Sequence, residues 1–194
     1  PTRRSSDLTM FLATVFYLPN PLSPIQILLV NLATDGLPAI ALGVDPADSD
    51  IMRQMPRAKN ESIFARGLVE KIVVRGTLIG LCTLLAFMVG RYYRMDLETC
   101  RTLALCTLVM SQLIHVFECR SERHSIFEIK LFTNMWLVGA VLVSIILICL
   151  VLYVPFLREI FHTVALNLKQ WLIVLFFSGI IALINSVYLL VKSK

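Results

Sequence analysis

The chain lacks several patterns that mark soluble enzymes and secreted proteins. Its five cysteines include no Cys-x-x-Cys pair, so a zinc cluster or a disulfide framework is not expected, and the thiols are interpreted as buried and inert. No glycine-rich loop of the Walker type occurs, and no signal peptide is visible. No segment alternates polar and apolar residues as the strands of a membrane barrel do.

Apolar residues dominate what is present. Hydrophobic residues make up 57% of the 194 residues and the mean hydropathy is +0.78, which is too apolar for a soluble domain and typical of several membrane spans. Five apolar stretches approach the ~20 residues that a crossing helix needs; they cover residues 25–43, 68–90, 99–117, 134–154 and 168–190. Because backbone groups in lipid must pair internally, we predict an all-α, multi-span transmembrane helix bundle.

The N-terminal part of the sequence does not fit this pattern. Residues 1–7 are polar and the chain begins without methionine, so we interpret them as an unrelated or artefactual N-terminus. The apolar stretch at residues 8–18 is too short to cross alone and is interpreted as the outer end of a helix whose start is missing. Residues 8–194 are expected to form one membrane domain.

Basic residues are concentrated in alternate connections. The loops 44–66 and 118–130 and the C-terminal tail contain Arg53, Arg57, Lys59, Arg66, Arg120, Arg123, Lys130, Lys192 and Lys194, whereas the opposite connections contain only Arg91, Arg94 and Arg158. This asymmetry places the two loops and the tail in the cytoplasm. The net charge of +5 is therefore interpreted as a signal of membrane orientation. The expected partner is a lipid bilayer, and no nucleic acid is expected to bind.

A polar motif interrupts the first full span and is the most informative feature of the chain. Residues 31–38 read NLATDGLP, with apolar residues on both sides. A carboxylate in hydrocarbon costs several kcal/mol, so Asp35 is interpreted as part of an ion or proton site that faces the protein interior. Gly36 lowers the cost of unwinding and Pro38 removes a helix donor. Together they predict one broken helix near residues 31–38.

Hard oxygen donors gather at this predicted break. Asn31, Thr34 and Asp35 share one face of a helix, and carbonyl oxygens freed beside them would add further donors. Such a cluster suits a hard cation such as Ca²⁺, and many transporters build midplane ion sites on broken helices. The alternative interpretation is a polar contact that joins helices, although Asp rarely serves that purpose.

A second, weaker polar set lies in the span 99–117. Gln112 and His115 are three residues apart beside Ser111, so both could face the same neighbouring helix. Interhelical hydrogen bonding and cation binding are equally compatible with Gln112. His115 is a less suitable ligand because a hard cation prefers oxygen.

Residues 24–39, which read PIQILLVNLATDGLPA, closely resemble the sixth transmembrane helix of P-type calcium-transporting ATPases. The pairs Asp45-Pro46 and Pro56-Arg57 resemble the following loop of that family, as do Asp48 and Ile51-Met52. Residues 165–171 resemble the entry to its tenth helix. The resemblance covers about residues 8–194, and implies the C-terminal membrane part of a pump, from the end of helix five to helix ten.

The resemblance also implies a set of metal ligands. Asn31, Thr34 and Asp35 match cation-coordinating positions of the family. Gln112 falls where two-site calcium pumps of the reticulum carry Glu and where plasma-membrane calcium pumps carry Gln. We therefore expect one Ca²⁺ per cycle, with Asp35 and Asn31 as the main ligands and Gln112 as a lesser one. Asn31 argues against a sodium pump, which resembles this region but carries Asp at that place.

The resemblance implies that the catalytic parts of the pump lie outside this chain. The phosphorylated Asp and the nucleotide and actuator domains would lie upstream, so no catalytic residue is expected here, and Mg²⁺ and ATP would bind only to the full-length protein. The expected partner is the missing N-terminal part of the same pump, in the plasma membrane of a bacterium.

Two alternatives remain: a secondary cation transporter or channel, which should carry a second broken helix, and an inactive pump fragment. The sequence leaves Ca²⁺ and Mn²⁺ open, because both accept oxygen donors.

Overall fold

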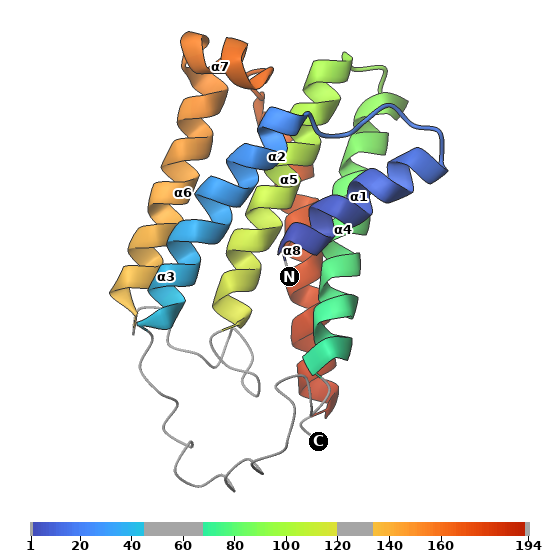
Figure 1. Cartoon of the computed structure of the whole chain (residues 1–194). Coiled ribbons are helices and arrows are strands. Elements are labelled where there is room, and N and C mark those ends of the chain that lie inside the picture. Colours follow the sequence, from blue (N-terminus) through green and yellow to red (C-terminus); the bar gives the residue numbers. More distant parts are fainter. Residues whose placement is uncertain (1, 45–67, 120–133, 193–194) are drawn as a thin grey trace, which may run out of the picture.

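The computed structural model describes residues 2–44, 68–119 and 134–192. Within these ranges the chain is helical and contains no strand, which confirms the predicted all-α class. The elements are α1 (Thr2–Val15), α2 (Pro24–Val30), the π-helix η1 (Asn31–Gly36), α3 (Leu37–Gly43), α4 (Leu68–Tyr92), α5 (Leu97–Glu118), α6 (Met135–Tyr153), α7 (Pro155–Phe161) and α8 (Leu168–Lys192). Figure 1 shows a bundle of long helices, with α1 inclined across α4.

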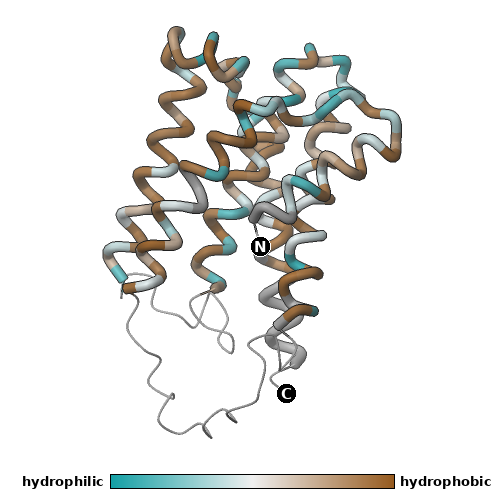
Figure 2. Tube along the Cα trace, in the orientation of Figure 1, coloured by the Kyte–Doolittle hydropathy of each residue, from teal (hydrophilic) through white to brown (hydrophobic). Residues whose placement is uncertain are grey.

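Among the described residues, three helices are long and apolar enough to cross a membrane. They are Ile72–Tyr92, Leu97–Glu118 and Met135–Tyr153, and they match the predicted spans 68–90, 99–117 and 134–154. The predicted span 168–190 lies within α8, and the span 25–43 is divided among α2, η1 and α3. Apolar residues follow the long helices over most of their length (Figure 2). The chain is therefore a multi-pass membrane protein.

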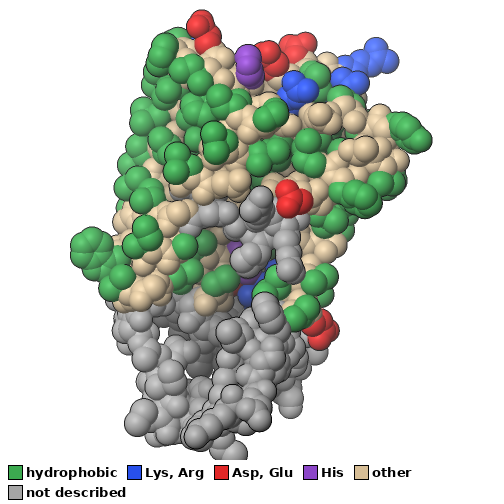
Figure 3. Space-filling model, viewed as in Figure 1, with side chains coloured by type: hydrophobic (Ala, Val, Ile, Leu, Met, Phe, Trp, Pro, Cys, Tyr) green, Lys and Arg blue, Asp and Glu red, His purple; other side chains and the backbone are tan. Residues whose placement is uncertain are grey.

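Helix α5 lies at the centre of the bundle. Inside the bundle, 78% of its apolar segment is buried, against 33% for α6. It packs against α4, α8, α2 and η1, and it supplies many side chains of the main core, including Leu103, Leu105 and Leu108. The surrounding helices expose large apolar side chains such as Val143 and Phe176, as expected of a surface that faces lipid. Figure 3 shows hydrophobic side chains over the visible flank and charged side chains gathered at its upper end.

The connections alternate between the two ends of the bundle. α3 and α5 end, and α4 and α6 begin, at the end where α8 also finishes (Figure 1). This is the end from which the two basic connections and the tail leave, as the charge asymmetry predicts. Those connections, residues 45–67 and 120–133, lie outside the described residues. At the opposite end, the predicted connector between the last two spans contains the short helix α7, which the sequence analysis missed.

Helix α1 begins before the apolar stretch 8–18 and ends at Val15. Ser5, Ser6 and Thr9 are buried, and the Thr9 hydroxyl donates to the Ser5 carbonyl at 2.7 Å and lies 3.3 Å from the Gly80 carbonyl on α4. Gly80 permits this approach, because a Cβ there would lie 3.2 Å from the Ser5 carbonyl oxygen. The helical state of residues 2–7 does not test their origin, so the interpretation as a foreign segment stays a prediction.

The outer end of α2 is fixed by one buried amide. Ser23 and Gln26 form a capping box, in which the Gln26 N–H donates to Ser23 Oγ (3.4 Å) and the Ser23 N–H donates to Gln26 Oε1 (3.0 Å). Gln26 Nε2 also donates to the carbonyls of Phe161 (3.1 Å) and His162 (3.2 Å) at the end of α7. Because Gln26 is fully buried, each lost bond leaves a polar group without solvent.

The substitution Gln26→Glu should destabilise the protein by about 2–3 kcal/mol, because a buried carboxylate would face two carbonyls that need donors. The capping acceptor would be kept. The matched control is Gln170→Glu, since Gln170 forms the same reciprocal cap with Asn167 at an exposed site; its effect should stay below about 0.5 kcal/mol. Chemical unfolding of the full-length protein in detergent measures both. Equal effects would show that the bonds to α7 contribute nothing.

Candidate functional site

The predicted interruption of the first full span is a π-helix. The α-helical pattern of α2 ends at Val30, six residues from Asn31 to Gly36 follow in η1, and α3 continues from Leu37. Gly36 and Leu37 keep right-handed helical dihedrals, so the chain continues in a helical path. The break therefore lies where it was predicted, and it takes the form of a π-helix rather than of an unwound segment.

Pro38 gives a physical reason for the wider turn. It is buried near the start of α3 and has no N–H for a carbonyl of the preceding turn, against which its ring would also clash in a regular helix. A change from i→i+4 to i→i+5 pairing relieves such a conflict locally, and π-helical turns occur frequently at functional sites. At the other end, the Asn31 N–H is shared between the carbonyls of Ile27 and Leu28.

The π-helix changes which positions of the motif lie on one face. A turn closed by i→i+5 bonds contains more residues than the 3.6 of an α-helix. Positions 31 and 35, four apart, therefore stay close to one face, whereas position 34 is turned further from position 31 than an α-helix would place it. The structure describes Asn31 as half-buried and describes the backbone, but not the side chains, of Thr34 and Asp35.

Gln112 lies in the helix that contacts this segment. It is fully buried on α5, and α5 packs against η1. The structure therefore brings the helix of Gln112 and the π-helix of Asn31, Thr34 and Asp35 together. The contact between individual ligand side chains is not described, so the four-residue ligand set stays a prediction.

Gln112 belongs to a stripe of buried polar residues along α5. Most of its members recur at spacings of three and four and run from mid-helix toward the end of α5 that faces the basic connections: Thr107, Ser111, Gln112, His115 and Glu118. The Ser111 hydroxyl donates to the Thr107 carbonyl at 2.6 Å. Polar side chains inside a membrane bundle face its interior, and these five side chains are buried inside the bundle.

The sequence analysis missed part of this stripe. It placed Glu118 in a charged loop, but the structure places it in the last turn of α5, buried and hydrogen-bonded to His115. The prediction of buried thiols is correct for Cys82, Cys100 and Cys106 and wrong for Cys119, which is exposed. The spacing of positions 115, 118 and 119 could have indicated this cluster, because residues three and four apart meet on one face of a helix.

Comparison with known proteins assigns the chain to a family. The family model described as "Cation transporting ATPase, C-terminus" matches residues 19–191. The chain belongs to this family of cation-transporting ATPases. The resemblance to the C-terminal membrane region of P-type calcium-transporting ATPases is thereby confirmed.

Several curated relatives of this chain are named as calcium-transporting ATPases. The calcium-transporting ATPase of Bacillus subtilis (strain 168) is 49% identical over 189 residues, which cover 96% of this chain and 21% of the relative. Calcium-transporting ATPase 1 of Bacillus cereus (strain ATCC 10987 / NRS 248) is 40% identical over 203 residues, with 96% and 23% coverage. Calcium-transporting ATPase type 2C member 1 of Mus musculus is 35% identical over 178 residues, with 91% and 19% coverage. The chain spans about a fifth of the length of these relatives.

The substitution Pro38→Ala should make the π-helix more regular, because it supplies the missing N–H. We expect amide exchange across residues 30–38 to slow by about fivefold, the effect of one recovered hydrogen bond of roughly 1 kcal/mol. The control is Pro155→Ala at the first position of α7, where no intrahelical bond is lost to proline. Hydrogen-exchange mass spectrometry of the full-length protein measures both, and unchanged exchange after Pro38→Ala would rule out proline as the cause of η1.

Proposed function

We propose that the chain forms the C-terminal membrane region of an ATP-driven Ca²⁺ pump and contributes part of a midplane Ca²⁺ site. The π-helix at Asn31–Gly36 is the observation that carries this proposal. It interrupts the helix within the motif that contains Asn31, Thr34 and Asp35, and it packs against α5, the helix that carries the polar stripe. The names of the relatives support Ca²⁺ as the ion.

The local chemistry is that of a hard-cation site. Asp35 supplies negative charge and Asn31 a neutral carbonyl oxygen, and these are donors that Ca²⁺ prefers. The return from i→i+5 to i→i+4 pairing skips one main-chain carbonyl, which adds an oxygen donor without adding charge. Thr34 is a further ligand of the same segment, and Gln112 is a lesser ligand supplied by α5. We propose one Ca²⁺ per cycle, because Gln112 offers an amide where a second site would need a carboxylate.

Transport would depend on the part of the pump that precedes this chain. Phosphorylation there, with ATP and Mg²⁺, would drive the bundle between inward-facing and outward-facing states. Asp35 would hold Ca²⁺ in the first state and release it in the second, taking up protons in exchange. Residues 44–66, most of which lie outside the described part, would couple the phosphorylated domain to α3. The bacterial relatives support a location in a bacterial plasma membrane.

One observation argues against a secondary transporter. Such proteins pair a broken helix in one half with a second in a related half. Among the described residues, η1 is the single π-helical interruption, and α4, α5 and α6 each continue without one. A pump is also distinguished from an inactive fragment by the upstream gene sequence, in which we expect the phosphorylation motif Asp-Lys-Thr-Gly-Thr.

The substitution Asp35→Asn in the full-length protein should abolish Ca²⁺-dependent phosphorylation by ATP. Loss of the ligand charge should lower the apparent Ca²⁺ affinity by about 100-fold or more. The matched control is Asp96→Asn, since Asp96 is exposed at the opposite end and its side chain caps nothing. Phosphorylation by inorganic phosphate without Ca²⁺ checks that the variant is folded. Normal Ca²⁺ activation of Asp35→Asn would refute the assignment.

The substitution Gln112→Ala should leave transport substantially intact and lower the apparent Ca²⁺ affinity by less than about tenfold, because an amide contributes no ligand charge. Uptake of radioactive Ca²⁺ into proteoliposomes, compared side by side with Asp35→Asn, measures the difference. A loss as severe as that of Asp35→Asn would make Gln112 a primary ligand.

A further inference from the structure

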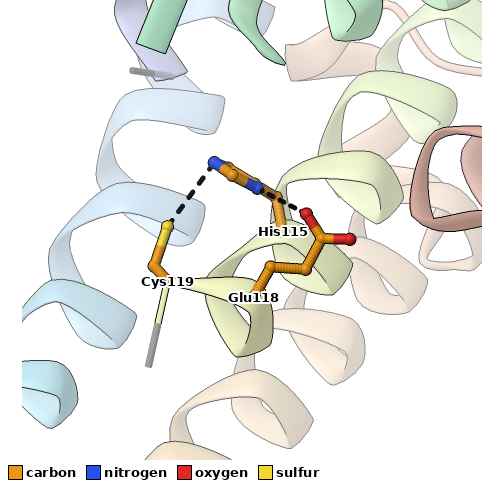
Figure 4. Close-up of polar contacts among 3 residues, drawn as sticks. All are labelled: His115, Glu118 and Cys119. Atoms are coloured by element: carbon orange, nitrogen blue, oxygen red, sulfur yellow. Dashed lines mark hydrogen bonds and ion pairs between the residues drawn. The ribbon is translucent and has the colours of Figure 1, made fainter. Parts of the chain in front are cut away.

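Three side chains form a line of polar contacts at the end of α5 (Figure 4). Glu118 Oε2 lies 3.0 Å from His115 Nδ1, and Cys119 Sγ lies 3.5 Å from His115 Nε2. His115 and Glu118 are buried, whereas Cys119 is exposed. The line therefore runs from a buried carboxylate through an imidazole to a thiol at the protein surface.

The helix itself sets this geometry. Residues 115, 118 and 119 are three and four apart, so their side chains meet on one side of α5. Cys119 is also the C-cap, and its N–H donates to the His115 carbonyl at 3.1 Å. This bond holds the start of the cysteine side chain one turn from the imidazole. The arrangement of nucleophile, base and orienting carboxylate is the one that activates catalytic thiols.

The surroundings favour the thiolate form of Cys119. Desolvation of the sulfur by itself raises its pKa, but the hydrogen bond to His115 and the positive charges of His115 and Arg75 outweigh this, so the pKa of Cys119 is lowered. Arg75 belongs to α4, which packs against α5. The negative charge of Glu118 opposes the shift. Thiols beside cationic groups are the ones that react.

A metal ion does not explain the cluster. The sulfur approaches one nitrogen of the imidazole and the carboxylate approaches the other, so the donors lie on opposite edges of the ring (Figure 4). No group of three His, Cys, Asp or Glu side chains among the described residues could hold a metal ion.

We propose that Cys119 is a reactive thiol and a site of covalent modification by small disulfides. His115 serves as its base, and Glu118 is the positioning residue that orients the imidazole. In the reaction, the Cys119 sulfur attacks one sulfur of the disulfide, a new S–S bond forms, and the original S–S bond breaks. The electron pair leaves with the second sulfur as a thiolate, which takes up the proton held by His115. Cys119 is oxidised and the small disulfide is reduced.

The other four cysteines provide a contrast within the same chain. Cys82, Cys100 and Cys106 are buried and Cys149 is half-buried. In the described structure, Cys119 is the one cysteine whose sulfur contacts a histidine. The proposal therefore predicts selective reaction at one thiol.

The test measures reaction rates at individual thiols of the full-length protein in detergent. Cleavage after Arg101 and Arg120 releases one peptide that contains both Cys106 and Cys119, so the buried thiol is an internal control. The probes are iodoacetamide and oxidised glutathione, followed by mass spectrometry over a range of pH. We expect Cys119 to react at least about tenfold faster than Cys106 at pH 7, and to keep reacting below the pH at which a free thiol, with a pKa near 8.5, loses reactivity.

Substitutions of His115 and Glu118 test how each residue affects the reactivity of Cys119. His115→Gln should slow the reaction of Cys119 at pH 7 by about tenfold and shift its pH profile upward, because the thiolate loses its cationic neighbour. Glu118→Gln removes both the contact that orients the imidazole and a negative charge that disfavours the thiolate, so its effect on the profile should be smaller than that of His115→Gln. His162→Asn is the control, since His162 is exposed at the opposite end of the molecule and should change nothing.

An ordinary pH profile for Cys119 in the unmodified sequence, or a profile that His115→Gln leaves unchanged, would overturn the proposal. The first result needs no variant, so a folding defect in His115→Gln cannot obscure it. Thiol reactivity is measured without Ca²⁺ or ATP, and the outcome is therefore independent of the proposed transport function.

Discussion

A helix inside a bilayer must pair its backbone groups within the protein, because lipid offers no partner. Pro38 makes this impossible for a carbonyl of the turn before it. The chain resolves this conflict with six residues of π-helix, which pack against α5. The rest of the fold follows from this demand, since an irregular ladder is tolerated at membrane depth only where protein or a polar cavity surrounds it.

Helix α5 supplies that environment. Among the three described helices that are long enough to span a membrane, α5 has the largest buried share, so its polar side chains are shielded from lipid by neighbouring helices. The stripe from Thr107 to Glu118 therefore lies in the interior of the bundle, whereas α6 exposes large apolar side chains such as Val143 and Ile146. A single central helix thus packs against the π-helix and carries the contact between His115 and Cys119 at its end.

Much of the architecture could be predicted from the sequence. The apolar spans are long, so hydropathy located α4, α5 and α6, and Asp35, Gly36 and Pro38 located the interruption. The type of interruption could not be predicted. Both π-helical pairing and local unwinding accommodate the missing N–H of Pro38, and the choice between them depends on the surrounding packing. Helix α7 was missed because seven residues beginning with proline resemble a turn. The contact between His115 and Cys119 was missed because Glu118 and Cys119 were assigned to a loop, where helical spacing carries no meaning.

The attachment of α2 to α7 has a consequence for sequence variation. Gln26 donates to main-chain carbonyls of residues 161 and 162, and every amino acid supplies such a carbonyl. The attachment therefore does not depend on the side chain at position 161, although Phe161 itself packs against the hydrophobic core. Position 162 is more restricted, because its φ of 49° favours residues that tolerate left-handed backbone, such as glycine and asparagine. For the attachment itself, tolerance to replacement at these two positions is thus decided by backbone torsion rather than by side-chain chemistry.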